Sequence, residues 1–287
     1  MASKAPSVWF ITGCSSGFGA ALTHEILSRG DKVIATARNA AKLSDLKTAG
    51  ADIMQVDVTD SLSNLKSAAK QAHDLYGRID YLINNAGYSA QGTLEELTPE
   101  ETQAQFDTNV FGLLNITRAF LPYLRAQRSG VIANVSSIGA WRGFAGVGVY
   151  TTSKWAVTGF SETMTAELAD FGIKVCCVEP GYFRSNFLNP GNRKKDESRI
   201  KDYEGTTSRK NAALMDEYDN KQPGDLKKGA KVMVDVLSGK NGREIPLRLP
   251  LGTDAYGIIK GKCEETLKLL EEWKDISVST DHDDVKK

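Results

Sequence analysis

Short apolar runs alternate with longer stretches of helical periodicity along most of the chain. The runs are rich in β-branched residues and predict strands at residues 8–11, 32–37, 53–56, 81–83, 131–135, 174–178 and 244–249. Between them, helical patterns cover residues 19–28, 40–48, 61–76, 99–125, 152–171 and 224–238. The early strands are apolar nearly throughout, which is typical of a parallel sheet with helices on both faces. The pattern therefore predicts an α/β fold with a doubly wound parallel sheet of about seven strands.

Two regions depart from this alternation. Residues 186–222 are polar and charge-rich with little strand character, and a long irregular insertion in a compact domain is usually a functional lid or disordered. We expect a lid there. Residues 254–274 have the pattern of an amphipathic helix, which we expect to pack on the domain surface within a C-terminal helical extension of residues 250–287. Since no repeat or linker divides the chain, residues 1–287 are expected to form one domain.

The composition is that of an ordinary globular protein, with 41% hydrophobic and 25% charged residues. The 36 basic and 36 acidic residues balance, which argues against a nucleic-acid partner. No apolar run approaches the roughly 20 residues that a spanning helix needs, and the run at 8–11 is too short for a signal peptide, so we expect no membrane association. The four cysteines form no Cys-x-x-Cys motif, which favours a reducing compartment and a cytoplasmic protein.

A glycine-rich turn follows the first predicted strand and precedes a helix. It reads Thr12-Gly13-Cys14-Ser15-Ser16-Gly17-Phe18-Gly19. Glycine lets the backbone turn tightly and approach a ligand closely, and the following helix N-terminus suits a pyrophosphate. No Gly-Lys-Ser/Thr follows, so the turn is not a P-loop. The order strand, turn, helix, strand favours dinucleotide binding.

The end of the second predicted strand bears on which dinucleotide binds. Folds that take NAD commonly place an acidic residue there to hold the adenosine ribose. Here the strand ends with Arg38 and no acid. A guanidinium can bind a 2′-phosphate that a carboxylate would repel, so Arg38 favours NADP(H) over NAD.

The candidate chemistry lies near the start of a helix, at Tyr150-Thr151-Thr152-Ser153-Lys154. Residues four apart share a helix face, so the Tyr150 hydroxyl and the Lys154 ammonium can serve one site. A neighbouring ammonium would lower the tyrosine pKa from its usual ~10 toward the range useful in acid–base catalysis. Ser137 follows the predicted strand at 131–135, and its hydroxyl could hold a carbonyl oxygen as charge develops on it.

In this order, these motifs resemble the short-chain dehydrogenases/reductases, over about residues 8–187. Asp57-Val58 resembles the pair beside the adenine ring, and Asn84-Asn85-Ala86-Gly87 resembles the segment along the cofactor. Asn109 matches the family's catalytic Asn, and residues 180–185 resemble the loop under the nicotinamide, with Ser185 where Thr is common. The resemblance implies a Rossmann-type fold. It implies a catalytic set of Ser137, Tyr150, Lys154 and Asn109, and cofactor contacts from Gly13, Ser15, Ser16, Gly17, Phe18, Gly19, Arg38, Asp57, Val58, Asn85, Ala86, Gly87, Tyr150, Lys154, Pro180, Gly181, Phe183 and Ser185.

The resemblance also implies an NADP(H)-dependent oxidoreductase that interconverts a ketone or aldehyde and an alcohol. In it, Tyr150 donates the proton, Ser137 orients the carbonyl oxygen, Lys154 binds the nicotinamide ribose, and Asn109 helps to hold a water in the proton relay. The expected partners are a small, apolar carbonyl or alcohol substrate and further copies of the chain in a homo-oligomer. The three histidines have no metal-ligand spacing, so no metal is expected.

Two other functions compete with this one. A non-catalytic dinucleotide sensor can share the fold, but such a protein would be expected to lose Tyr150 or Lys154. Epimerases and dehydratases of sugar nucleotides usually carry a different glycine spacing and a larger C-terminal domain. The sequence leaves open whether the substrate is steroid-like, polyketide-like or a small ketone. Aromatic residues that could line its pocket are Trp141, Phe144, Tyr182, Phe183 and Phe187.

Overall fold

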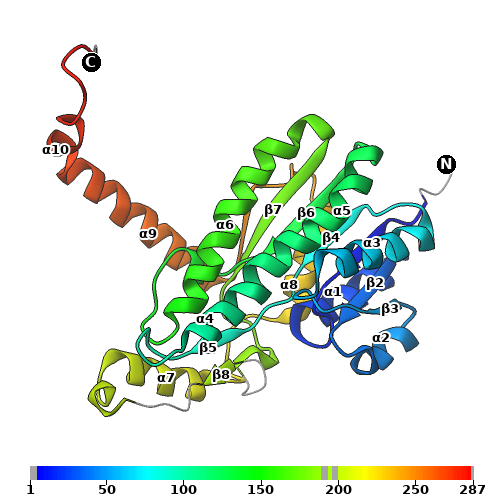
Figure 1. The fold of residues 1–287 in the computed structure, drawn as a ribbon, viewed down its shortest axis with the longest axis horizontal. Helices are drawn as coiled ribbons and strands as arrows, with labels where there is room; N and C mark the ends of the chain where they lie inside the picture. Colours follow the sequence, from blue (N-terminus) through cyan, green and yellow to red (C-terminus); the bar gives the residue numbers. More distant parts are fainter. Residues whose placement is uncertain (1–4, 189–192, 196–199, 286–287) are drawn as a thin grey trace.

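A seven-stranded parallel sheet forms the centre of the molecule in the computed structural model, which describes residues 5–188, 193–195 and 200–285 (Figure 1). Its strands lie in the order β3-β2-β1-β4-β6-β7-β9. They are β1 (Val8–Ile11), β2 (Lys32–Ala37), β3 (Asp52–Gln55), β4 (Tyr81–Asn84), β6 (Gly130–Val135), β7 (Ile173–Pro180) and β9 (Arg248–Leu251). Strand β1 pairs with both β2 and β4, so the winding direction reverses there, and a crevice opens at the carboxyl ends of these strands. The predicted doubly wound fold is confirmed.

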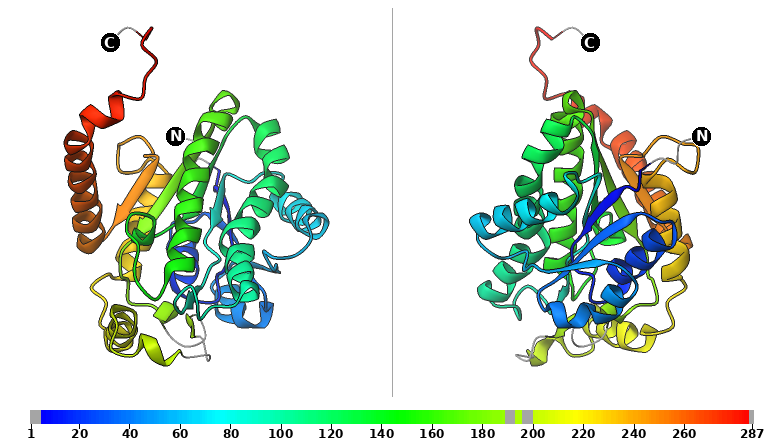
Figure 2. Two further views of the ribbon diagram at one scale, coloured as in Figure 1. Left: turned by 60° about the vertical axis from the view of Figure 1, so that its left-hand side comes forward. Right: turned by 90° about the vertical axis from the view of Figure 1, so that its right-hand side faces the viewer.

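Helices cover both faces of the sheet (Figure 2). Helices α1 (Gly17–Ser28), α2 (Ser44–Thr48) and α8 (Leu226–Leu237) pack on one face, and α3 (Leu62–Tyr76), α5 (Leu113–Gln127) and α6 (Gly148–Leu168) on the other. Alternation along β1 feeds both cores, because Trp9 and Ile11 point to the first and Val8 and Phe10 to the second. None of the described helices is long and apolar enough to cross a membrane.

The main differences from the sequence prediction concern three elements. The last strand lies at Arg248–Leu251 instead of residues 244–249, because the chain turns through Gly239 and Gly242 at positive φ and reaches the sheet later. The long helix predicted at 99–125 is interrupted. It consists of α4 (Pro99–Phe106), a π-helical segment at Asp107–Gly112 and α5. The predicted helix at 40–48 also begins as a 3-10 helix, Ala40–Leu43, before α2.

The described parts of the predicted lid, residues 186–188, 193–195 and 200–222, are more regular than their composition predicted, and the rest of it lies outside the described residues. These parts contain α7 (Thr207–Tyr218) and the short strand β8 (Arg193–Lys195), which pairs in parallel with β5 (Ser89–Gln91) in a second, two-stranded sheet. An ion pair between the partly exposed Arg209 on α7 and the buried Glu96 fastens this segment to the loop after β5. Local propensity did not indicate these elements because tertiary contacts hold them.

The C-terminal extension is helical, as predicted, but the expectation that it packs on the domain surface is wrong. Helix α9 (Thr253–Glu272) and the short α10 (Lys274–Val278) extend away from the body in Figure 1. Ala255 is the single buried residue of α9. Only the first turns of α9 therefore join the domain.

Candidate active site

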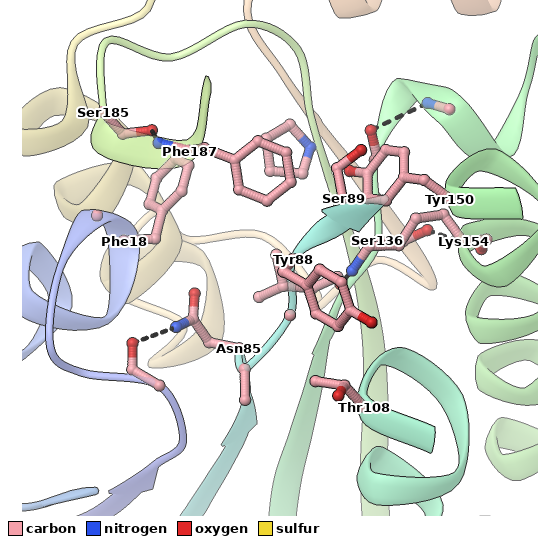
Figure 3. Close-up of a pocket in the computed structure, with 18 of the residues that line it drawn as sticks. Phe18, Asn85, Tyr88, Ser89, Thr108, Ser136, Tyr150, Lys154, Ser185 and Phe187 are labelled. Carbon is pink, nitrogen blue, oxygen red and sulfur yellow. Dashed lines mark hydrogen bonds between the residues drawn. The ribbon is translucent and has the colours of Figure 1, made fainter. Parts of the chain in front are cut away.

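A pocket of about 500 Å³ lies at the carboxyl ends of the sheet strands, where the sequence placed the dinucleotide (Figure 3). Its wall comes from the turn before α1, from the ends of β2, β4, β6 and β7, from the start of α6, and from the segment that contains α7. In the close-up, Phe18 and Asn85 lie on one side, and Tyr150 and Lys154 of α6 on the other. The pocket therefore joins the predicted cofactor turn to the predicted catalytic residues.

The glycine turn has the close backbone contacts that its sequence implied. Gly13 has a φ of +72°, and a Cβ there would lie 2.8 Å from the Ala86 Cα. A Cβ on Gly19 would lie 2.5 Å from the Gly13 carbonyl oxygen. The Asn85 side chain donates to the Thr12 carbonyl oxygen at 2.9 Å, which ties the turn to the end of β4. Only glycine can occupy these positions without moving the backbone.

The structure brings together all but two of the residues predicted for catalysis and cofactor binding. Trp141, which the sequence suggested as part of the substrate pocket, instead lines a separate groove. The residues that line the pocket are Gly13, Ser15, Ser16, Gly17, Phe18, Arg38, Asp57, Val58, Asn85, Ala86, Gly87, Ser137, Tyr150, Lys154, Pro180, Gly181, Phe183 and Ser185. The two exceptions are Gly19, which allows the tight turn from behind, and Asn109, which lies buried behind the pocket wall.

Tyr150 and Ser137 form the polar centre of the pocket. Their side chains are hydrogen-bonded to each other. Ser137 also accepts a hydrogen bond from the Gly139 amide at 3.0 Å, which fixes the short 3-10 turn Ile138–Ala140. The indole of Trp141 donates to buried Glu179 on β7 at 2.8 Å and anchors the far end of this turn. Ser137 is thus held in place by backbone and by a buried polar contact.

Lys154 reaches the same centre from one turn further along α6. The side chain is 5% exposed, and its Nζ donates to the Val135 carbonyl oxygen at 2.8 Å, at the end of β6. Its Nζ lies 5.9 Å from the centroid of the Tyr150 ring. The backbone oxygen of Lys154 accepts from Ser136 at 3.0 Å. The predicted pairing on one helix face is therefore present.

Burial has the largest effect on the pKa values of Tyr150 and Lys154. It raises the pKa of Tyr150 to about 12, although the hydrogen bond with Ser137 lowers it in part. Tyr150 keeps an open edge on the pocket, and its remaining surroundings are dense protein. Burial also lowers the pKa of Lys154 to about 8. The sequence reasoning expected the ammonium to lower the tyrosine pKa, whereas desolvation sets the direction of this shift in the structure.

Asn109 lies in the π-helical segment and holds the pocket wall from behind. Its Oδ1 accepts from the Tyr88 amide at 3.1 Å, and its Nδ2 donates to the Tyr88 carbonyl oxygen at 3.1 Å and to Ser153 at 3.0 Å. A Cβ on Gly87 would lie 3.1 Å from the Asn109 Oδ1 and 3.5 Å from the Lys154 Nζ. The π-helical segment thus brings the Asn109 side-chain amide beside the backbone at Gly87. Short π-helical segments frequently occur at functional sites.

Arg38 and Asp57 lie at the end of the pocket away from Tyr150. Arg38 is exposed at the rim and forms no ion pair with any described residue. The Asp57 carboxylate accepts from the Thr59 amide at 3.0 Å and from its hydroxyl at 2.8 Å, so part of its hydrogen-bonding capacity serves its own turn. A free guanidinium therefore lies at the end where the sequence predicted a 2′-phosphate.

Sequence reasoning missed Asp254, at the start of α9. Its carboxylate accepts from the Tyr182 amide at 2.6 Å and lies against Gly181, where a Cβ would collide with it. This carboxylate fixes the loop that the resemblance placed under the nicotinamide. No motif marks Asp254, because 72 residues separate it from Tyr182.

Gln222 was also missed. Its side chain lines the pocket and is 1% exposed, and its Oε1 has no hydrogen-bond partner. Its Nε2 has a long contact of 3.5 Å with Asp219. A buried acceptor without a partner is costly in a folded protein, so this atom is a candidate for contact with a ligand.

The substrate side of the pocket is largely apolar. The Phe187 ring lies 5.8 Å from the Tyr150 ring, and Figure 3 shows the two facing each other. Further apolar lining comes from Phe144, Val147, Leu188 and Met215. Within the described part of the chain, no group of three His, Cys, Asp or Glu side chains could hold a metal ion. The site is built for hydrogen bonding beside an apolar surface.

The doubly wound sheet, with a pocket that joins a glycine turn to Tyr150, is the arrangement of an oxidoreductase. Comparison with known proteins specifies it further. The family described as short chain dehydrogenase matches residues 7–196, close to the span of the resemblance noted from the motifs. The chain belongs to this family.

Similar proteins of known sequence and structure agree with this family assignment. The chain is 36% identical to Oxidoreductase BOA17 of Botryotinia fuckeliana, over 95% of this chain and 98% of that protein. It is 40% identical to a 3-ketodihydrosphingosine reductase of Bacteroides thetaiotaomicron, over 69% of this chain and 72% of that protein. A short-chain dehydrogenase structure from Streptomyces avermitilis has a TM-score of 0.87 and 37% identity, covering 97% of this chain and all of that one. Another structure, from Burkholderia cenocepacia in complex with NADP, has a TM-score of 0.71 and 27% identity. It covers 93% of this chain and 97% of that one.

Proposed function

We propose that the protein is an NADP(H)-dependent reductase that interconverts a ketone or aldehyde and the corresponding alcohol. The observation that carries this proposal is the position of the Tyr150 hydroxyl. It is hydrogen-bonded to Ser137 and faces the apolar end of the same pocket that begins at the glycine turn. A carbonyl oxygen placed there would meet two hydroxyl groups, while its carbon would face the loop at residues 180–185.

The pocket suits a dinucleotide along its whole length. Ser16, Gly17 and Phe18 at the start of α1 line the pocket, and the helix N-terminus there would bind a pyrophosphate. Asp57 and Val58 would contact the adenine, and Pro180, Gly181 and Ser185 the nicotinamide. The bound nicotinamide would supply or accept the hydride.

The chain's own residues would handle the proton and the oxygen. In reduction, Tyr150 donates a proton to the carbonyl oxygen while Ser137 donates a hydrogen bond that keeps the oxygen in place. A raised pKa keeps Tyr150 protonated at neutral pH, which suits a proton donor. Lys154 would bind the nicotinamide ribose, and its charge would favour the tyrosinate that remains after proton transfer. Asn109 would hold a water beside Lys154.

Arg38 supports NADP(H) as the cofactor. Its guanidinium is exposed at the adenosine end of the pocket without an ion pair among the described residues, so it is available to a 2′-phosphate. The related structure from Burkholderia cenocepacia binds NADP, which supports the same choice.

The substrate would carry an apolar body and one hydrogen-bond donor. The apolar lining around Phe187 and Met215 would bury the body, and the unpaired Gln222 Oε1 would accept from a hydroxyl or amide group. The segment at 186–222 would act as the lid, because Phe187, Leu188 and Met215 belong both to it and to the pocket wall. The name of the Bacteroides relative, a 3-ketodihydrosphingosine reductase, supports the reductive direction.

A panel of ketones with NADPH, followed by NADPH absorbance, tests the proposal. We expect turnover of apolar ketones that Tyr150→Phe nearly abolishes without weakening NADPH binding, because only the proton donor is lost. Ser137→Ala should lower turnover more than it weakens NADPH binding. Full activity of Tyr150→Phe would refute the assigned proton donor. NADPH binding without turnover of any ketone would favour the dinucleotide sensor.

A further inference from the structure

A carboxylate from the C-terminal helix α9 holds the loop that follows β7. We call residues 180–185 the nicotinamide loop, because the proposed function places that ring beside them. Asp254 accepts a hydrogen bond from the Tyr182 amide through its Oδ2, at 2.6 Å. Its Oδ1 accepts from the Ala255 amide of its own helix, at 2.9 Å. A single side chain therefore joins the start of α9 to a wall of the pocket.

Two glycines make room for this carboxylate. A Cβ on either Gly181 or Gly252 would collide with the Asp254 Oδ1. Gly252 has a φ of +108°, so its backbone conformation also favours glycine. Gly181 does not have a positive φ, so the close approach of Asp254 accounts for glycine at this position and the backbone conformation does not. Both chain segments are thus shaped around one carboxylate.

Capping of α9 does not account for this arrangement. The N-cap residue of α9 is Gly252, and Asp254 is the second residue of the helix itself. A carboxylate in the first turn interacts favourably with the helix dipole, but that interaction needs no contact outside the helix. The hydrogen bond from Tyr182 reaches across 72 residues of sequence. It therefore serves the loop as well as the helix.

The other anchors of the nicotinamide loop leave one peptide group to Asp254. The Gly181 amide donates to the Leu251 carbonyl oxygen at 2.8 Å, and the Tyr182 carbonyl oxygen accepts from the Gly224 amide at 3.0 Å. The peptide group between these two anchors joins Gly181 to Tyr182, and its N–H donates to Asp254. In a trans peptide the C=O points opposite to the N–H, so the Gly181 carbonyl oxygen points away from Asp254. Asp254 thus sets the orientation of this peptide group.

We infer that Asp254 is a positioning residue, which holds the nicotinamide loop in the conformation that binds the nicotinamide half of the dinucleotide. The inference rests on the proposed function for the identity of the ligand. Gly181 and Tyr182 line the pocket and Asp254 does not, so Asp254 acts through these two residues. Arg38 and Asp57, at the adenosine end, belong to other parts of the chain and should not depend on it. The two halves of the ligand should therefore respond differently to the loss of Asp254.

Binding of two ligands to the wild type and to Asp254→Ala tests this difference without reference to turnover. NADPH would span the whole pocket, whereas adenosine 2′,5′-bisphosphate has the adenosine end and no nicotinamide. Calorimetry should give a Kd for NADPH that is roughly tenfold higher in the variant, and an unchanged Kd for the bisphosphate. Asp254→Asn keeps one acceptor oxygen and should give an intermediate Kd for NADPH. An unchanged Kd for NADPH in Asp254→Ala, or an equal loss for both ligands, would overturn the inference.

Asp80→Ala is the matched control. Asp80 accepts from the Val8 amide at 2.8 Å, at the start of β1 and so at the opposite edge of the sheet from the pocket. This variant also loses a carboxylate that binds a backbone amide, and it should be less stable with both Kd values unchanged. Asp254→Ala would behave in the same way if Asp254 served the helix alone. A wild type that does not bind NADPH would refute the proposed function and this inference with it, whereas NADPH binding that Asp254→Ala leaves intact would refute this inference alone.

Hydrogen exchange reports on the loop in the free protein, before any ligand binds. The Tyr182 amide donates to Asp254 in the wild type, so it should exchange roughly tenfold faster in Asp254→Ala. Asp80→Ala should leave this rate unchanged. Equal exchange of the Tyr182 amide in the wild type and in Asp254→Ala would mean that Asp254 does not hold the loop.

Gly181→Ala disturbs the same contact from the opposite side. The three atoms that its Cβ would meet first all belong to the Asp254 carboxylate, so this substitution should weaken NADPH binding when Asp254 is present. In the Asp254→Ala background those atoms are gone, and Gly181→Ala should add little to the loss. Calorimetry on the two single variants and the double variant measures this coupling. Losses that simply add would contradict the proposed role of Asp254.

Discussion

Lys154 shows how a single residue can weaken the fold in order to serve the site. An ammonium that is 5% exposed has lost most of its hydration, and the hydrogen bond to the Val135 carbonyl oxygen replaces only part of it. The resulting fall in the pKa of Lys154, to about 8, measures that cost in the folded state. In the proposed reaction, the same buried charge stands beside Tyr150, where weak solvent screening makes it effective.

We therefore expect Lys154→Met to be inactive yet more stable than the wild type near neutral pH. Below pH 8 the lysine is charged in both states, and the folded state alone bears the desolvation cost, about 3 kcal/mol. Between pH 8 and the unfolded value near 10.5, the folded protein releases its proton first, so wild-type stability rises with pH. Denaturant unfolding should show a larger difference in the free energy of unfolding between variant and wild type at pH 7 than at pH 10. A less stable variant at pH 7 would contradict this account.

Gln222 gives a second prediction at this scale. If its Oε1 accepts a hydrogen bond from the substrate, Gln222→Leu should raise KM about three- to tenfold for ketones that carry a hydroxyl or amide donor. Ketones without a donor should keep their KM or bind better, because a buried unpaired oxygen has been removed. NADPH affinity, measured by tryptophan fluorescence, serves as the control. Loss of NADPH affinity instead would make the cofactor the partner of Gln222.

At the scale of elements, the sequence predicted the strands and helices that obey a simple period. The strands at Val8–Ile11 and Lys32–Ala37 were located to the residue, because apolar runs bounded by polar or glycine residues leave little choice of register. The π-helical segment around Asn109 was not predictable, since its residues have the same periodicity as the helices beside it. Helix α7 and β8 were missed because their composition is polar, and contacts such as Arg209 with Glu96 hold them in place.

The Arg209–Glu96 pair should decide how firmly the 186–222 segment covers the pocket. Burial alone would raise the pKa of Glu96, but hydrogen bonds from Thr93, Arg209 and the Ile200 amide lower it to about 2. Arg209→Met keeps the length of the side chain and removes the charge, which leaves Glu96 buried with fewer partners. We expect faster trypsin cleavage after Lys201 and Lys210, and a higher KM with NADPH affinity little changed.

Two measurements separate this role from general instability. Lys231→Met removes the exposed partner of an ion pair with Asp235, outside the pocket lining, and should leave both cleavage rate and KM unchanged. In the wild type, NADPH together with a substrate should slow cleavage in the segment if it closes over the site. Cleavage of Arg209→Met at the wild-type rate would mean that the pair does not hold the segment.

At the scale of the whole molecule, the site gathers residues from one edge of the sheet. Motif order alone placed most of them correctly, because successive parallel strands all deliver their carboxyl ends to that edge. Asp254 and Gln222 escaped notice because they come from segments after β7, where no motif marks the return of the chain to the pocket. The exposure of α9 also could not be foreseen, since its amphipathic pattern equally fits a helix packed on its own domain.

Because the cofactor would bridge the strand ends, its binding should stabilise the domain as a unit. A ligand at 100 times its Kd adds about 2.7 kcal/mol to the free energy of unfolding, which corresponds to several degrees in Tm for a domain of this size. We expect NADPH to raise the Tm more than NADH does at equal concentration, because Arg38 can bind the 2′-phosphate. Arg38→Asp should abolish most of the NADPH shift and leave the NADH shift unchanged or larger. Arg78→Asp, which changes another exposed arginine, should not alter the preference between cofactors. Equal loss of both shifts in Arg38→Asp would mean that Arg38 supports the fold, and the preference for NADP(H) would then have no basis in this residue.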